Sequence, residues 1–166
     1  SHIGDITNLT TVFSKNVIEN NINELSDLKK ELGKNPRNYD QWLQVGLLKK
    51  FFNNYKGAED AWQYATIVNP KASTAFANLA NLYTMYLNDY PKAEEYFRKA
   101  ISIDKETSPQ YYIGLADLYD HFFIERRDRV PEILLEGISV IPSDTNMKVR
   151  LADYYKQLGN QREATH

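Results

Sequence analysis

The chain has 166 residues and a formal net charge of −2, with 42% hydrophobic and 25% charged residues, a composition typical of one folded array. The near-neutral charge argues against a nucleic-acid partner, which would need a basic face. The absence of Cys excludes disulfides and Cys-rich zinc sites, although it does not fix the cellular compartment. No apolar run approaches the ~18 residues needed to span a bilayer, and no signal peptide is visible. We therefore expect no nucleic-acid binding and no membrane contact by this part of the protein.

The N-terminal residues divide into an arm and a helix. Residues 1–16 are polar and rich in Thr and Asn, and we expect an irregular or loosely helical arm that carries one glycosylation sequon at Asn8-Leu9-Thr10. A helical stripe follows, with apolar residues at steps of three and four: Ile18, Ile22, Leu25, Leu28 and Leu32. Gly33 and Pro36 then end the pattern. We interpret residues 17–35 as a capping helix or a degenerate half-repeat.

A pattern of large and small residues recurs with a period near 34 from residue 39 onward. Trp42 recurs as Phe76, and the Leu-Ala pair at 79–80 recurs at 115–116 and again at 151–152. A small-aromatic-small triplet recurs 35 residues later, as Ala58, Trp62 and Ala65 and then as Ala93, Phe97 and Ala100. These spacings place each group on one face of a helix. Small residues allow close helix approach, so each unit is predicted to be two antiparallel helices that need neighbours to cover their apolar faces.

This pattern resembles the tetratricopeptide repeat, whose signature is W-x2-L-G-x2-Y, then A-x3-F, then P. The resemblance implies an all-α fold, a right-handed α-solenoid of antiparallel helix pairs. We place the repeats at residues 39–72, 73–107 and 109–144, with a truncated fourth at 145–166. Lys49 departs from the signature, because Tyr is usual there. Because the chain stops inside the fourth repeat and Ser1-His2 looks like a cloning remnant, we expect an excised fragment, whose parent protein could carry a signal or membrane anchor.

The turns of the second and third repeats contain one and two extra residues. We therefore expect the first helix of the third repeat to extend to about Ile124 and to end in a charged loop. In the last repeat the first helix is predicted at about 146–158, as a C-terminal cap whose apolar residues Leu151, Tyr155 and Leu158 are partly uncovered.

The resemblance also implies a peptide-binding groove, because the first helix of each tetratricopeptide repeat lines the concave face. The positions that match this face are Leu43, Leu47, Lys50, Phe51, Asn78, Asn81, Met85, Gln110, Asp117, Asp120, His121, Arg150 and Asp153. The groove is predicted to be apolar in the first repeat, rich in amides in the second, and acidic to mixed in the last two. Apolar side chains of the peptide would pack near Leu47 and Phe51, and its basic side chains would pair with the three aspartates. Asn78 and Asn81 would hydrogen-bond the peptide backbone, because an amide both donates and accepts.

The function implied is therefore a protein–protein interaction scaffold or adaptor that binds a peptide or protein partner. Two alternatives stay open: a structural spacer that self-associates through its N-terminal arm or truncated C-terminal end, or the regulatory part of a larger enzyme or membrane-anchored protein. A family variant that grips a C-terminal carboxylate is disfavoured, because only Asn78 of the five positions tested matches; the other four are Leu43, Leu47, Gln110 and Gly114.

Other chemical signals are weak. Asp117 and His121 lie four residues apart and offer two metal ligands without a visible third. The arginines at 126, 127 and 129 are either a phosphate grip or a solvated turn, and the adjacent apolar residues 122–124 cannot all face one core. No Gly-rich phosphate loop, H-E-x-x-H or G-x-S-x-G motif is present. We expect no enzyme activity, no catalytic residues, no metal and no cofactor.

Overall fold

The computed structural model describes residues 13–164, and every regular element in that range is helical. Most of the predicted N-terminal arm, including the sequon at residues 8–10, lies outside the described residues. The chain divides into two compact units, Ser1–Leu82 and Tyr83–His166. Within residues 13–164, no helix is both long enough and apolar enough to cross a membrane.

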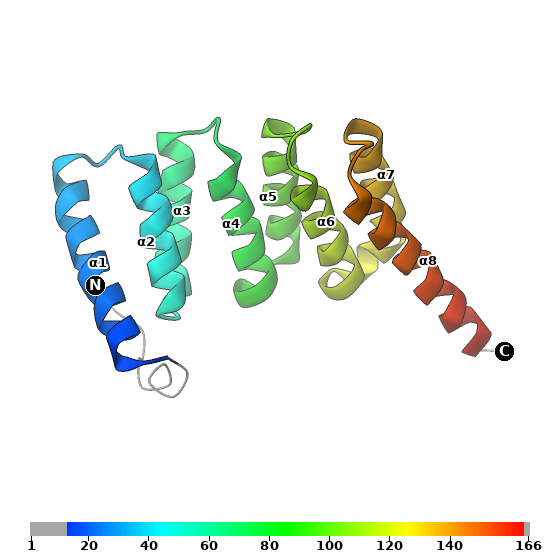
Figure 1. Cartoon of the computed structure of the whole chain (residues 1–166), viewed down its shortest axis with the longest axis horizontal. Helices are drawn as coiled ribbons and strands as arrows, with labels where there is room; N and C mark the ends of the chain where they lie inside the picture. The colour runs from blue at the N-terminus through cyan, green and yellow to red at the C-terminus, as the bar shows by residue number, and fades with distance from the viewer. Residues whose placement is uncertain (1–12, 165–166) are drawn as a thin grey trace. The chain divides into compact units, whose positions relative to one another are not determined.

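In the described part of the first unit, residues 13–82, there are four helices: α1 (Lys15–Lys34), α2 (Tyr39–Phe51), α3 (Tyr55–Val68) and α4 (Ser73–Leu82). Consecutive helices run antiparallel (Figure 1). Ser14 caps α1 by accepting from the Val17 N–H at 3.4 Å, so the helix begins at Lys15, two residues before the predicted start at residue 17. Asn38 caps α2 by accepting from the Gln41 N–H at 3.1 Å.

Close packing of α2 against α3 depends on a glycine and two alanines. A Cβ at Gly46 would overlap the indole of Trp62. That indole is buried and donates its Nε1–H to the Leu43 carbonyl oxygen at 3.1 Å. Ala58 and Ala65, on the same face as Trp62, are fully buried. The small residues therefore do what their spacing predicts, and let an aromatic ring lie against a bare helix backbone.

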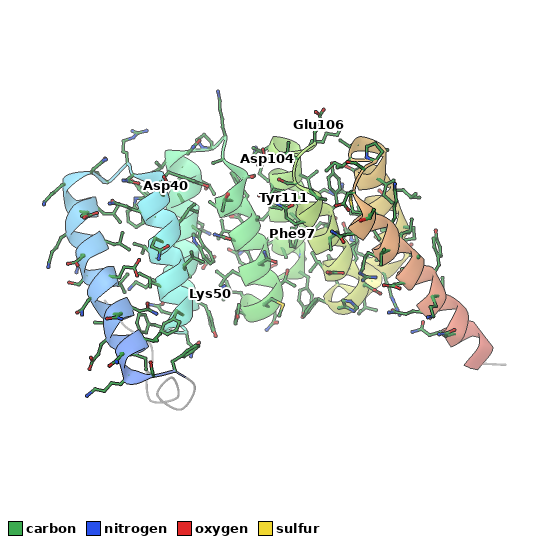
Figure 2. The ribbon with its side chains drawn as sticks, in the orientation of Figure 1. Asp40, Lys50, Phe97, Asp104, Glu106 and Tyr111 are labelled. Carbon is green, nitrogen blue, oxygen red and sulfur yellow. The ribbon has the colours of Figure 1, made fainter. Side chains whose placement is uncertain are left out.

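As far as residue 164, the second unit has four α-helices and three short helical turns: η2 (Tyr83–Leu87), α5 (Tyr90–Ile103), α6 (Pro109–Asp117), η3 (Leu118–Phe122), η4 (Ile124–Arg129), α7 (Val130–Val140) and α8 (Thr145–Ala164). Phe97 of α5, which recurs at the place of Trp62, lies with its ring against Gly114 of the following helix, α6 (Figure 2). Tyr112 and Met147 meet at Gly137 in the same way. α7 packs against both α6 and α8.

The extra residues of the second and third repeats are absorbed in π-helical turns. η2 and η3 are both π-helical, and in η3 the Phe123 N–H donates to the Leu118 carbonyl oxygen at 2.7 Å. A π turn adds a residue without breaking the helix. The first helix of the third repeat thus stays helical to Phe122, close to the predicted end, although η4 is a 3₁₀ helix where a charged loop was expected.

The last helix differs from its expected end. α8 continues to Ala164 instead of stopping near residue 158. No proline interrupts residues 145–164, and Gly159 keeps a negative φ, so nothing in the backbone ends the helix earlier. Met147 and Tyr154 anchor α8 as buried residues, whereas Tyr155 is 52% exposed. The predicted uncovered face is therefore present on a longer helix.

Candidate functional site

The predicted groove residues of the first repeat form a partly exposed apolar face on α2. Leu47 is 42% exposed, and Leu43, Lys50 and Phe51 are half-buried. The Phe51 ring lies 4.9 Å from the ring of Phe13 and 5.1 Å from that of Phe52, measured between centroids. Lys50 lies near the C-terminal end of α2, and Asp40 near its N-terminal end (Figure 2).

The two predicted amides lie on α4, the next first helix of the same unit. The Tyr39 hydroxyl of α2 accepts from the Ala75 N–H of α4 at 3.2 Å, which ties the two helices together. Asn78 is half-buried, and its side chain forms no hydrogen bond with any described residue. Asn81 is exposed and donates its Nδ2–H to the Ala77 carbonyl oxygen at 3.1 Å, which leaves its own carbonyl oxygen for another donor. We refer to Leu47, Phe51, Asn78 and Asn81 as the α2–α4 face.

In the second unit, several predicted groove residues form an internal ion network instead of an open surface. Asp120 is 3% exposed, and its carboxylate accepts from Arg127 Nε at 2.8 Å and from Arg150 Nη2 at 2.6 Å. Arg150 Nε also donates to Asp117 at 2.8 Å. Burial alone would raise the pKa of Asp120, but the hydrogen bonds from Arg150 and Arg127 outweigh it and hold the pKa below its usual value.

This network joins α6, η3, η4 and α8, and so it ties the last helix to the elements before it. His121 is exposed at its edge, with Nε2 3.8 Å from Asp120. Met85, Gln110 and Asp153 are also exposed and lie outside the network. Sequence reasoning assigned the charged residues to a groove and missed their mutual pairing, because residues 117–127 and 150 are brought together only by the packing of α8.

The arginines of η4 are paired within the same unit. Arg126 lies 3.5 Å from Glu94, and Arg129 donates to Glu132 at 2.9 Å. Glu94 also accepts from the Tyr119 hydroxyl at 2.6 Å. Burial and this hydrogen bond raise the pKa of Tyr119 to about 12. The arginines of η4 thus pair with neighbouring carboxylates while their side chains stay partly exposed, at 42% for Arg126 and 32% for Arg129.

Sequence reasoning also missed a cavity in the first unit, between α1 and α2. Its volume is about 530 Å³, and it lies where Lys49 replaces the Tyr of the repeat signature. That replacement was the available signal. No group of three potential metal ligands gathers within residues 13–164, and Asp117 of the predicted two-ligand pair is engaged by Arg150.

Comparisons with known proteins agree with this architecture. The sequence profile of the tetratricopeptide repeat matches residues 73–107. The fold is similar to the crystal structure of MamA, with a TM-score of 0.67 and 19% identity over 85% of this chain and 80% of that chain. It is also similar to the tetratricopeptide repeat domain of Arabidopsis OM64, with a TM-score of 0.56 and 18% identity over 71% of this chain and 94% of that chain. No curated protein matches the chain.

A third similar structure is TTC0263, a thermophilic tetratricopeptide repeat protein of Thermus thermophilus, with a TM-score of 0.63 and 19% identity over 79% of this chain and 71% of that chain. Together with the helix pairs described above, these similarities define an all-α solenoid protein. The resemblance seen in the sequence is confirmed: residues 73–107 are a tetratricopeptide repeat, and the chain has the fold of tetratricopeptide repeat proteins.

Proposed function

We propose that the protein is an interaction scaffold that holds a peptide or protein partner on the α2–α4 face. The observation that carries the proposal is the half-buried Asn78 amide, which has no hydrogen-bond partner among the described residues. An amide half removed from water and free to donate and accept is suited to a peptide backbone. Leu47, which is 42% exposed on α2 of the same unit, offers an apolar side chain to the same partner.

The general use of this fold supports the proposal. Solenoid repeats expose extended surfaces on which they bind partners, and the α2–α4 face consists of the first-helix positions that the family uses. The exposed Met85, Gln110, His121 and Asp153 give the second unit a set of side chains for the same purpose. Asp117, Asp120 and Arg150 serve the ion network in this proposal.

The test is a quantitative pull-down from the lysate of the source organism with the whole chain as bait. Partners that wild type captures are expected to be lost with Asn78→Ala/Asn81→Ala. The matched control is Asn20→Ala/Asn23→Ala, which removes two exposed amides from α1, far in sequence from the face. If the α4 variant keeps its folded circular dichroism spectrum and retains the same partners as the control, the assignment to the α2–α4 face is wrong.

A second candidate function, self-association, is favoured by the exposed apolar residues of α8. Val149 is 59% exposed and Tyr155 is 52% exposed. Sedimentation over a range of protein concentrations tests it. A mass that rises with concentration in wild type and stays monomeric in Val149→Glu/Tyr155→Glu supports self-association through α8, whereas a constant wild-type mass opposes it.

A further inference from the structure

The cavity between α1 and α2 is an apolar hollow at one end of the first unit. It is lined from α1 by Ile22, Leu25, Ser26, Lys29, Leu32 and Gly33, and from α2 by Trp42, Val45 and Lys49. Each set follows steps of three and four along its helix, so the two lining faces oppose each other. Its volume of about 530 Å³ is within the range of roughly 300–1,000 Å³ that ligand pockets occupy.

The hollow has a cause in the sequence. The Tyr of the repeat signature is present as Tyr83 in the second repeat, 2% exposed, and as Tyr119 in the third, 0% exposed. Lys49 holds the equivalent position in the first repeat. A lysine can lay its stem along an apolar wall but must keep its ammonium group in water. The volume that a buried ring fills elsewhere in the chain is therefore left open here.

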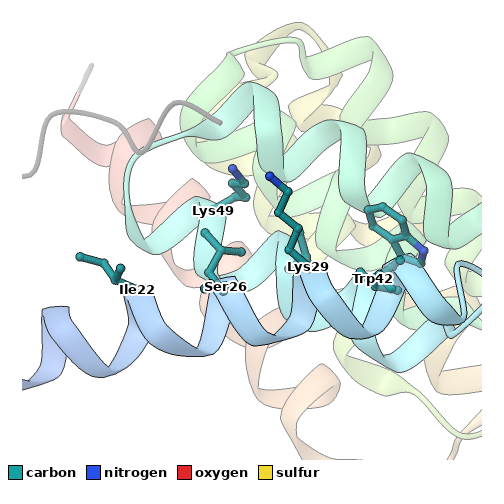
Figure 3. Close-up of a pocket in the computed structure, with 9 residues that line it drawn as sticks. Ile22, Ser26, Lys29, Trp42 and Lys49 are labelled. Carbon is teal, nitrogen blue, oxygen red and sulfur yellow. The ribbon is translucent and has the colours of Figure 1, made fainter.

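The two edges of the seam between α1 and α2 differ in chemistry. Along one edge the helices are joined by amide–carboxylate hydrogen bonds, from Gln44 to Glu24 at 2.8 Å and from Gln41 to Glu31. The cavity lies along the other edge, and its lining residues include Lys29 from α1 and Lys49 from α2 (Figure 3). Neither lysine forms an ion pair with a described residue. One edge is thus closed by hydrogen-bonded polar groups that include two carboxylates, and the other is an apolar hollow with unpaired positive charge.

We propose that this hollow is a second binding site, for an acidic peptide that inserts bulky apolar side chains between α1 and α2 and places carboxylates against Lys29 and Lys49. Apolar side chains bury the surfaces of half-exposed residues such as Ile22 and Leu25. The peptide carboxylates form charge-assisted hydrogen bonds with the two lysine ammonium groups at the opening of the hollow. The half-buried Trp42 on the wall provides an aromatic contact and a spectroscopic reporter. The site is separate from the α2–α4 face, which uses other positions of α2.

The probe is a short capped peptide in which Leu and Phe lie one helical turn apart between flanking Glu residues. Calorimetry and the fluorescence of Trp42 report binding to the whole chain; Trp62 is 1% exposed and does not line the hollow. Wild type is expected to bind the acidic peptide, to bind it less tightly at high salt, and to bind neither a version with Lys in place of Glu nor one with Ala in place of Leu and Phe.

Charge reversal makes the test specific. Lys29→Glu/Lys49→Glu is expected to lower the affinity for the acidic peptide at least about tenfold, or roughly 1.4 kcal/mol, and to gain binding of the Lys-flanked peptide. Lys30→Glu/Lys71→Glu is the matched control, with the same change in net charge at exposed lysines outside the hollow. Ser26→Phe, which places a ring in the hollow, is expected to block the peptide without reversing any charge.

Three results would overturn the proposal. The first is equal weakening by the two charge-reversal pairs, which would indicate a nonspecific electrostatic effect. The second is loss of the peptide in Asn78→Ala/Asn81→Ala, which would place it on the α2–α4 face; retention there separates this site from the proposed function. The third is a Trp42 response to dodecanoate but to no peptide, which would make the hollow a site for a small anionic amphiphile.

Discussion

At the scale of single residues, one buried carboxylate and one glycine determine much of the local packing. Asp120 is buried and accepts from Arg127 and Arg150, so its removal leaves the partly buried Arg127 without its acidic partner and Arg150 with Asp117 alone. Gly46 allows the Trp62 indole to lie on the α2 backbone. At Asp120 a single charge allows neighbouring helices to pack together, and at Gly46 the absence of a single Cβ atom does so.

The substitution Asp120→Asn is expected to lower the free energy of unfolding by about 2–4 kcal/mol, because it leaves a buried polar cluster with an uncompensated charge. Urea denaturation followed by circular dichroism measures it. Asp153→Asn, an exposed aspartate on α8, is the control and is expected to change stability by less than about 0.5 kcal/mol. Equal effects of the two substitutions would contradict a structural role for the network.

The Asp120 carboxylate also makes the stability of the folded protein depend on pH. Its pKa is depressed in the folded protein, so the stability it contributes is present above its unfolded value of about 3.9 and is lost as pH falls through the lower folded value. Wild type is expected to lose stability below about pH 4 more steeply than Asp120→Asn does. Denaturation midpoints measured at several pH values compare the slopes, and parallel slopes would exclude Asp120 as the source.

The substitution Gly46→Ala is expected to destabilise the protein by about 1–3 kcal/mol, because the new methyl group would overlap the Trp62 ring and displace the bond from its Nε1–H to Leu43. Thermal denaturation measures it. Gly159→Ala is the control, since a Cβ there meets nothing within 4 Å and alanine favours the helix. A neutral result at Gly46 would mean that α2 and α3 can separate without cost.

At the scale of helices, the repeats differ where one residue departs from the shared pattern. The extra residues of the second and third repeats become the π turns η2 and η3, and the helix pairs survive. Asn53 and Asn88, 35 residues apart, both adopt a positive φ, of 57° and 53°, in the turn that follows the first helix. Asn tolerates this conformation better than most residues. Lys49 has the opposite effect, because it opens a hollow where the other repeats are filled.

The substitution Lys49→Tyr is therefore expected to stabilise the first unit by about 1 kcal/mol, because a ring would bury apolar area between α1 and α2. Chemical denaturation measures the gain. Lys71→Tyr, at an exposed lysine after α3, is the control and is expected to have little effect. A loss of stability in Lys49→Tyr would show that the hollow cannot accept the ring that fills the equivalent place in the second and third repeats.

At the scale of the whole molecule, stability should be local. In repeat arrays each helix pair contacts only its neighbours, so a change in one pair reaches distant pairs weakly. In this chain the largest groups of mutually contacting helices are the two compact units, Ser1–Leu82 and Tyr83–His166.

Hydrogen exchange tests this locality. Asp120→Asn is expected to increase amide exchange in α6, α7 and α8 far more than in α2 and α3, and Gly46→Ala is expected to do the reverse, because opening free energies follow local packing. Peptide-resolved mass spectrometry compares the two variants. A uniform increase along the chain in both variants would show that the array unfolds as one cooperative body.

What the sequence by itself determined is the periodic part of this protein. Trp42, Gly46, Ala58 and Trp62 predicted a helix pair because burial follows the spacing of large and small residues along a helix, and the recurrence of the pattern predicted the solenoid. Contacts between distant positions needed the tertiary structure. Two of the predicted groove aspartates, Asp117 and Asp120, belong to an ion network because the packing of α8 brings Arg150 to them from 33 and 30 residues away. The hollow beside Lys49 likewise exists because α1 and α2 stand opposite each other there. Periodicity is a property of each helix, whereas pairing and cavities depend on which faces the folded chain brings together.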